Sequence, residues 1–201
     1  MVPGSFYHVY NHANGSENLF IEAKNYDFFL ERISVYILPF ISLHAYCLLP
    51  NHFHLLISIK EIDDIKRLES FKIIQMLSND KLQPIIEKKV SKSFSNLFSS
   101  YTQSINKVYK RKGSLFMPNM KSVLIEDEAG ICKVVHYVHA NAVHHGFAKR
   151  LSDWKYSSYN GYLSQAATKL SKEAILKIFG SREYFIKYHQ QPIVVKLKWD
   201  A

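Results

Sequence analysis

The chain has 201 residues, of which 47% are hydrophobic and 21% are charged. This is about the length of one ordinary domain, and the composition excludes a disordered or low-complexity chain, because so many apolar residues can bury a core. Lys and Arg number 26 against 17 Asp and Glu, which gives a formal net charge of +9, with 10 His and 13 Tyr in addition. A basic, aromatic-rich chain suits a polyanionic partner, nucleic acid first and an anionic membrane second. A solvated basic surface with no special partner is the alternative.

Local signals argue for a reduced compartment and against a membrane span. Cys47 and Cys132 form no CxxC pair and no disulfide framework, which favours a cytoplasmic protein. No basic segment followed by an apolar one begins the chain, so no signal peptide is expected. Residues 33–59 contain no Asp, Glu, Lys or Arg and are long enough for a membrane helix. Prolines and histidines interrupt this stretch, so we interpret it as a helix end followed by two buried strands.

The first third of the chain predicts a strand, a helix and a strand pair. Aromatic and β-branched residues alternate over 5–12, which is typical of a strand. Apolar residues recur at helical spacing from about 24 to 38, and Pro39 ends that pattern. Two short apolar runs follow at 42–49 and 52–59. Only two residues separate them, so they predict a hairpin or a tightly linked strand pair.

The middle of the chain predicts a helical insertion, a helix, a strand and a further helix. Residues 60–92 are charged and loosely periodic, which indicates a helical insertion. Residues 93–111 form a clearer amphipathic helix, with basic residues in the last turn and a glycine after it. Residues 121–125 predict a fourth strand. Asp127 can cap a helix that runs to about Val143.

This order of elements predicts an α+β fold, with one antiparallel sheet that carries helices on one face. A small helical appendage is expected at 172–190, after a segment rich in Ser and Tyr. We therefore expect a main domain over residues 1–163, with the helical insertion at about 60–92. Residues 164–201 are expected to form a C-terminal helical appendage and tail.

His52 and His54 are the most chemically suggestive local feature. Residues i and i+2 of a strand project from the same face, about 7 Å apart, so two imidazoles can converge on one metal ion. The alternate residues of this strand are all apolar and are expected on the helix-covered face: Phe53, Leu55, Ile57 and Ile59. The two histidines would then lie on the opposite, more open face. Two ligands do not make a site, and strand histidines that only form hydrogen bonds at a polar surface are the alternative.

The helix at 127–143 offers a third ligand and a nucleophile. At about 100° per residue, Tyr137 and Asn141 lie some 40° apart on one border of its apolar stripe, whereas His139 lies on the other. The amide oxygen of Asn141 can ligate a divalent ion, and the phenol of Tyr137 can act on a substrate beside it. A tyrosine at a helix border can equally be an amphipathic filler with its hydroxyl in water.

Three segments in order resemble the single-tyrosine HUH transposases, and most closely the branch of REP-associated tyrosine transposases. The run LHAYCLLPNHFHLLISI (43–59) resembles the His-hydrophobic-His motif of this family. The run VVHYVHANAVHHGF (134–147) is similar to its Tyr-x-x-x-Asn helix, and DWKYSSY (153–159) to its Asp-Trp-x-x-Ser-Ser segment. With weaker matches at the first strand and at 106–116, the resemblance spans roughly residues 5–163.

The resemblance implies a ferredoxin-like core that cuts and rejoins single-stranded or hairpin DNA. It implies that Tyr137 is the nucleophile, which forms a 5′-phosphotyrosine, and that His52, His54 and Asn141 bind Mg²⁺ or Mn²⁺. Both homodimers and monomers occur in such a family, so neither is excluded. Two positions depart from the pattern, because Ala142 stands where a proline is usual and Pro118-Asn119 where a basic residue is common.

Basic residues near aromatic ones are candidate DNA contacts. They are Lys107, Lys110, Arg111, Lys112 and Lys121, with a second group at Lys149 and Arg150. Each such run can instead be a solvated face. Two other functions stay open: a non-catalytic hairpin-DNA-binding module on the same fold, and a metal-dependent hydrolase that uses the two histidines without a tyrosine intermediate.

Overall fold

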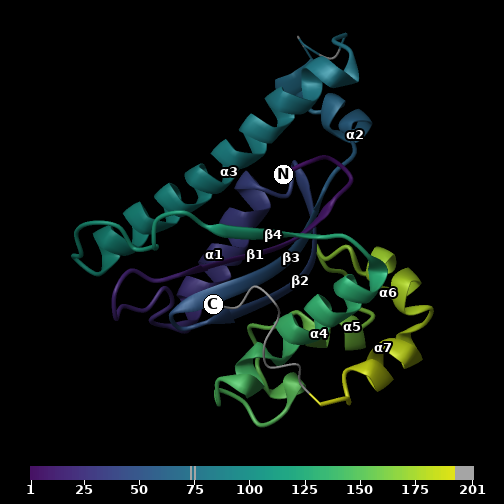
Figure 1. Ribbon diagram of the computed structural model, residues 1–201. Helices are drawn as coiled ribbons and strands as arrows, with labels where there is room; N and C mark the ends of the chain where they lie inside the picture. The colour runs from purple at the N-terminus through teal and green to yellow at the C-terminus, as the bar shows by residue number, and fades with distance from the viewer. Residues whose placement is uncertain (73, 75, 193–201) are drawn as a thin grey trace.

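A four-stranded antiparallel sheet lies at the centre of the computed structural model, which describes residues 1–72, 74 and 76–192 (Figure 1). The strand order is β2-β3-β1-β4. The strands are β1 (Phe6–His12), β2 (Ile41–Leu49), β3 (His52–Ile59) and β4 (Lys121–Ile125). The helices are α1 (Ala23–Tyr36), α2 (Ile62–Lys66), α3 (Asn79–Val108), α4 (Glu128–His144), α5 (Tyr159–Leu163), α6 (Lys172–Phe179) and α7 (Arg182–Tyr188). Two 3₁₀ turns complete the list, η1 (Glu69–Phe71) and η2 (Leu151–Asp153).

The connectivity of the sheet is ferredoxin-like, as expected. The chain runs β1-α1-β2-β3-α3-β4, and the two central strands, β1 and β3, come from separate halves of that unit. The two-residue connection at Pro50-Asn51 makes β2 and β3 an antiparallel pair, with Leu49 opposite His52. The predicted α+β class and antiparallel sheet are confirmed.

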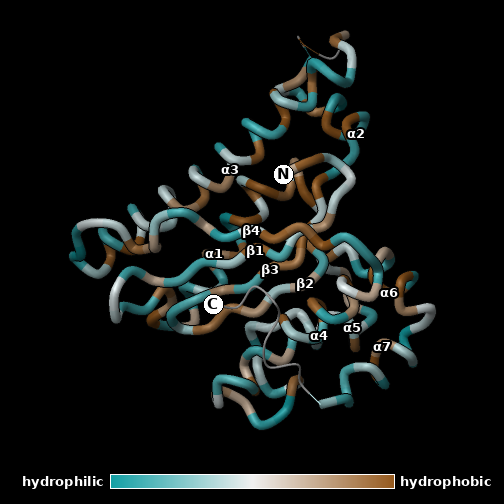
Figure 2. The backbone as a smooth tube through the Cα atoms, in the orientation of Figure 1, coloured by the Kyte–Doolittle hydropathy of each residue, from teal (hydrophilic) through white to brown (hydrophobic). Residues whose placement is uncertain are grey.

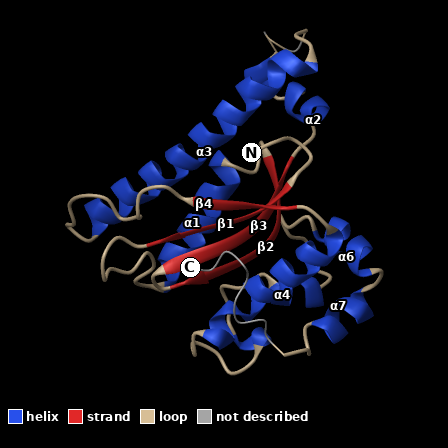
Figure 3. Cartoon of the chain, in the orientation of Figure 1, coloured by secondary structure: helices blue, strands red, loops and turns tan. Residues whose placement is uncertain are grey.

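One face of the sheet packs against α1 and α3, which lie on the same side in Figure 3. The apolar residues of β3 point into this core, as their alternation predicted: Phe53, Leu55, Ile57 and Ile59. Phe29 of α1 and Tyr101 of α3 are buried against them, with ring centroids 5.0 Å apart. Burial of these large side chains is the main stabilising term for this layer.

Helices cover both faces of the sheet, so the expectation of helices on one face is wrong. On the second face α4 lies across β2 and β3, and α5, α6 and α7 pack around it (Figure 1). Val134 and Val138 of α4 meet Ala45 and Cys47 of β2, all of them fully buried. The sequence of α4 is apolar around most of its circumference, and such a helix is stable only when it is buried on several sides.

The predicted insertion divides into a short helix, a 3₁₀ turn and, from Asn79, the first part of one long helix. The helix expected at 93–111 begins at Asn79, because Leu82, Ile86 and Val90 continue the buried stripe of its second half. Alternating hydrophobic and hydrophilic segments along α3 are visible in Figure 2. α2 packs against the N-terminal part of α3. Residues 73 and 75 of the insertion lie outside the described residues.

The expected C-terminal appendage contains α6 and α7. Ile175 of α6 and Phe185 of α7 are fully buried in the core that also contains α4. The part of the appendage from residue 193 lies outside the described residues. No helix within the described part of the chain combines the length and the apolar character that a membrane span requires.

Candidate active site

β3 directs His52 and His54 to the face of the sheet that α4 covers. Their ring centroids lie 5.2 Å apart, so the predicted common face is correct. The prediction of an open face is wrong, because each histidine is only 4% exposed. The strand pattern showed which residues share a face, but it could not show that a later helix would cover that face.

α4 brings the predicted tyrosine and amide to the same place. Its first turn is fixed by Asp127, whose Oδ1 accepts a hydrogen bond from the backbone N–H of Gly130 at 2.6 Å. Three turns further on, the Tyr137 ring meets the His54 ring edge-on, with centroids 5.4 Å apart. Asn141 Oδ1 lies 3.3 Å from His52 Nε2. All four predicted residues therefore meet within a single chain.

The contact between His52 and Asn141 fits a bound cation. His52 Nδ1 lies 2.8 Å from Asn51 Oδ1, so this nitrogen carries the proton and Nε2 carries a lone pair. Burial, followed by the influence of His12, lowers the pKa of His52 to about 4, which keeps the ring neutral near pH 7.

Two acceptor atoms, His52 Nε2 and Asn141 Oδ1, thus face each other with no proton between them. Neighbouring ligands of an octahedral ion, each about 2.1 Å from it, lie about 3 Å apart, close to the separation seen here. Asn141 Nδ2 is buried and has no partner among the described residues. A rotation of the amide by 180° would place Nδ2 against His52 and leave the ligating oxygen unpartnered instead. In the orientation of the structure, Oδ1 faces the lone pair of His52 Nε2 and Nδ2 is left unpartnered, and this arrangement suits a divalent ion between the two acceptors.

Further histidines surround the pair, and sequence reasoning missed them. His8 Nε2 lies 3.0 Å from His54 Nδ1, and the His12 ring stacks on His52 at 4.7 Å. His145, just after α4, lies 4.9 Å from His52 between ring centroids. The alternation of His8, Tyr10 and His12 along β1 was the available signal, because residues two apart share a face. Burial, then nearby histidines, holds the pKa of His54 well below its usual value.

The candidate metal ligands do not form a conventional cluster. No group of three or more His, Cys, Asp or Glu side chains in the described ranges could hold a metal ion. The predicted set therefore depends on Asn141 as the third ligand, a residue type outside those four. An imidazole and amide-oxygen set suits Mn²⁺ somewhat better than the harder Ca²⁺.

The strand register brings one predicted DNA contact to the site. Lys121 of β4 pairs with Tyr10 of β1, and Tyr10 pairs in turn with His54 of β3. Directly paired residues of an antiparallel sheet point to the same face. Lys121 is exposed, and it therefore lies in the same row and on the same face as His54, two strand spacings away.

The other predicted cations lie on loops and helix ends around the sheet. Lys107, Lys110, Lys112, Lys149 and Arg150 are all exposed. Arg111 is not available in the same way, because it forms an ion pair with Glu17 and a hydrogen bond with Asn106. Arg150 pairs with Asp153 at 2.9 Å. The two arginines thus have protein partners. We therefore expect phosphate contacts from the exposed lysines rather than from Arg111 and Arg150.

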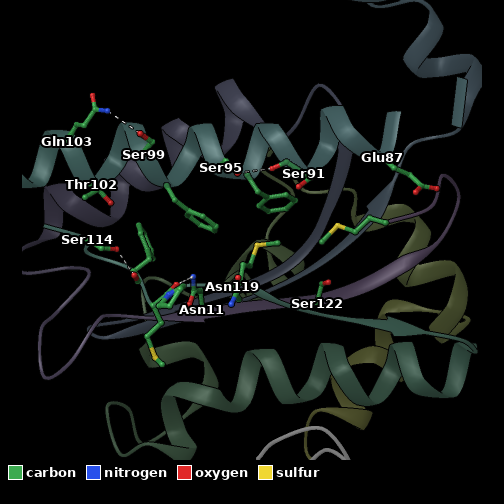
Figure 4. A pocket seen from close by; sticks show the side chains of 17 residues that line it. Asn11, Glu87, Ser91, Ser95, Ser99, Thr102, Gln103, Ser114, Asn119 and Ser122 are labelled. Carbon is green, nitrogen blue, oxygen red and sulfur yellow. Dashed lines mark hydrogen bonds between the residues drawn. The ribbon is translucent and has the colours of Figure 1, made fainter. Parts of the chain in front are cut away.

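A separate cavity of about 680 Å³ lies between α3 and residues 114–122 (Figure 4). Its walls include Ser91, Ser95 and Ser99 of α3, and Phe98 and Phe116 line it as well. The sheet separates this cavity from α4 in Figure 4, so it is not part of the tyrosine–histidine site.

Known proteins resemble this chain first in their fold and then in their sequence. The chain shares its fold with a solved structure of a REP-associated tyrosine transposase bound to a REP hairpin, with a TM-score of 0.56. The match covers 86% of this chain and 92% of that one at 17% identity, a level that shows the fold alone. No family model matches the sequence.

A sequence relative points to the same branch. A protein of Haemophilus influenzae, provisionally named a REP-associated tyrosine transposase, is 26% identical over 116 residues. The matched region covers 58% of this chain and 57% of the relative, so the chain matches little more than half of that curated protein. The chain is therefore similar in fold to one REP-associated tyrosine transposase and, over 116 residues, in sequence to a protein that carries the same family name.

Proposed function

We propose that this protein is a transposase-type enzyme that cleaves and rejoins single-stranded or hairpin DNA through Tyr137, with Mg²⁺ or Mn²⁺ bound by His52, His54 and Asn141. The observation that carries the proposal is the meeting of His52 with Asn141 and of His54 with Tyr137. The solved relative is bound to a REP hairpin, which supports hairpin DNA as the substrate class.

The proposed reaction conserves phosphoryl bonds. The phenol oxygen of Tyr137 attacks the phosphorus and loses its proton, and the 3′ oxygen of the upstream strand leaves and becomes a hydroxyl. The downstream strand stays linked to Tyr137 through its 5′ phosphate. A 3′ hydroxyl can later reverse the step, so no nucleotide cofactor is required. His52, His54 and Asn141 would hold a divalent ion, which would polarise the scissile phosphate and stabilise the negative charge of the transition state.

Other parts of the chain have proposed supporting roles. Lys121, on the same face as His54, would contact a backbone phosphate next to the one that is cleaved. We assign the reaction to a domain of residues 1–163. The appendage from residue 164 onward is assigned a structural role, in which it packs against α4. The full residue set occurs in one chain, so a monomer contains every proposed catalytic group.

Covalent capture tests the proposal. The protein is incubated with a single-stranded hairpin library and Mn²⁺, then denatured and separated by electrophoresis. A label at the 3′ end of the DNA should migrate with the protein, and a label at the 5′ end should be released. Tyr137→Phe should abolish the adduct, because only the phenol oxygen can carry the 5′ phosphate. An adduct that persists in this variant refutes Tyr137 as the nucleophile.

Tyr10→Phe is the matched control. The Tyr10 ring also stacks on His54, with centroids 5.5 Å apart, so Tyr10 is the tyrosine most able to substitute for Tyr137. The adduct should survive in Tyr10→Phe. The opposite pattern, with loss in Tyr10→Phe and survival in Tyr137→Phe, would transfer the nucleophile to β1.

The burial of the site favours one second candidate, a non-catalytic hairpin-binding module. Tyr137 is only 7% exposed, so a DNA strand reaches it only if the surrounding residues move. This candidate predicts salt-sensitive hairpin binding with no covalent adduct under any metal condition. The capture experiment therefore distinguishes the two functions directly.

A further inference from the structure

We propose that His8 is a positioning residue for His54, which it holds in the tautomer that presents Nε2 to a metal ion. The inference rests on the proposed metal-assisted function. It concerns a residue outside the His-hydrophobic-His motif and outside the proposed ligand set. His8 comes from β1, 46 residues before His54, and the fold brings the two rings together.

The contact is well defined. His8 Nε2 lies 3.0 Å from His54 Nδ1, and the two rings are nearly parallel, with an angle of 16° and centroids 5.1 Å apart. His8 is fully buried. It occupies the position on β1 diagonal to His54, since Tyr10 is the direct partner of His54 and Leu56 is the direct partner of His8. A buried imidazole held by strand pairing on one side and a ring stack on the other has little freedom to turn away.

Only one proton can lie between these two nitrogens. If it belongs to His54 Nδ1, then His54 Nε2 has a free lone pair and can bind a metal ion. If it belongs to His8, then His54 Nε2 carries a hydrogen and cannot bind. Metal-ligating histidines generally donate their second ring N–H to such a partner, which fixes both tautomer and orientation. His8 Nε2 is the acceptor that this arrangement needs.

The second histidine ligand shows the same arrangement. His52 Nδ1 is held by Asn51 Oδ1 at 2.8 Å, and its Nε2 faces Asn141. Both ligand rings are therefore engaged through Nδ1, one by an amide oxygen and the other by an imidazole. Nδ1 of His8 has no partner among the described residues, so no competing hydrogen bond fixes His8 in the opposite tautomer.

The test measures Mn²⁺ affinity by calorimetry, without DNA. His8→Leu removes the acceptor, and the dissociation constant should rise about 10- to 100-fold, as for other outer partners of metal ligands. His8→Gln places an amide oxygen near the former Nε2 and should restore most of the affinity. The side chain of His8→Asn is too short to reach His54, so this variant should behave like His8→Leu. It provides a second test if the leucine variant does not fold.

His44→Leu is the matched control. His44 is also a buried strand histidine with both ring nitrogens bonded, to Ser58 Oγ at 2.8 Å and to the Ser171 carbonyl at 3.1 Å. It has no contact with the candidate ligands in the described structure. Its loss should leave Mn²⁺ affinity near the wild-type value, whereas a general effect of removing a buried histidine would weaken binding in both variants.

A second measurement reports the tautomer itself. Nitrogen-15 NMR of the Mg²⁺-loaded protein should show the His54 proton on Nδ1 in the wild type and in His8→Gln. Wild-type Mn²⁺ affinity in His8→Leu and His8→Asn would overturn the inference, and so would a His54 proton on Nε2. Equal loss of affinity in His8→Gln and His8→Leu would also overturn it, because the acceptor would then be irrelevant.

The two proposals fail separately. If Mn²⁺ binding depends on His8 but no DNA adduct forms, the positioning role stands and the enzymatic function is refuted. If the adduct forms but His8 variants bind Mn²⁺ normally, the function stands and the positioning role is refuted. If the wild-type protein binds no Mn²⁺, both the metal role and the positioning role are refuted.

Discussion

Substitution of His189 by Gln tests whether the packing of α7 onto α4 requires a neutral imidazole. His189 Nδ1–H donates to the Phe185 carbonyl at 2.8 Å, and Nε2 accepts from His139 Nδ1 at 2.9 Å. His139 Nε2 in turn accepts from the hydroxyl of Ser158 at 2.8 Å. The His136 ring also faces His189, with centroids 5.1 Å apart. No acidic side chain takes part in these four contacts, so a proton on His189 would be buried without a counter-charge.

Burial, as the main cause, lowers the pKa of His189 from 6.5 to about 3. Because the folded pKa lies below the unfolded value, the contribution to stability is complete above pH 6.5 and is lost as the pH falls. The unfolded chain binds a proton that the folded chain excludes, at a cost of about 1.36 kcal/mol per pH unit. Between pH 7.5 and pH 5 the expected loss is about 2 kcal/mol for this residue alone.

Urea unfolding at pH 7.5, 6.5, 5.5 and 5, roughly spanning the unfolded pKa of a histidine, measures this loss. His189→Gln keeps an acceptor for His139 but cannot titrate, so its free energy of unfolding should fall by about 2 kcal/mol less than that of the wild type over the same range. Parallel pH profiles for the two proteins would refute the reasoning, because His189 would then not be excluded from protonation in the folded state.

Three further predictions concern the core, the helix that carries the site and DNA binding. Tyr101→Phe removes the hydroxyl that donates to the Leu19 carbonyl at 2.7 Å, and thermal unfolding should show a loss of about 1–2 kcal/mol; an unchanged Tm contradicts this. Asp127→Ala removes the N-cap of α4, which should cost about 1 kcal/mol in urea unfolding and lower the adduct yield; equal stability would count against the cap. Lys121→Gln should reduce the slope of the logarithm of the DNA-binding constant against log salt by about 0.7 for a single strand, as measured by fluorescence titration. Lys88→Gln on α3 is the control, and equal effects of the two substitutions would rule out a specific contact at Lys121.

Local periodicity was sufficient to predict most of the helices and strands, and to predict which residues within one element share a face. The bounds of β3 and β4 match the predicted 52–59 and 121–125, since alternating apolar residues and tight turns are short-range signals. The shared face of His52 and His54 follows from a period of two in a strand. The proximity of Tyr137 and Asn141 follows from the period of 3.6 in a helix. The basic surplus favoured a polyanion, and the ordered motifs narrowed that to single-stranded or hairpin DNA.

Only the tertiary structure shows that α4 covers the face of the sheet that carries His52 and His54. A strand with apolar residues on one face and histidines on the other can leave the polar face in water or bury it beneath a later helix, and its own pattern is the same in both cases. The helical wheel likewise placed His139 on a border of the apolar stripe, yet His139 is fully buried, because His189 packs against it.

The amino-acid sequence is therefore enough to establish which chemical groups the protein carries and which of them are neighbours along one helix or strand. The tertiary structure decided which elements meet. His8 and His54 are 46 residues apart, and His52 and Asn141 are 89 apart. Such contacts depend on strand register and on the packing of whole apolar surfaces, which are summed over many residues and leave no signal at any single position.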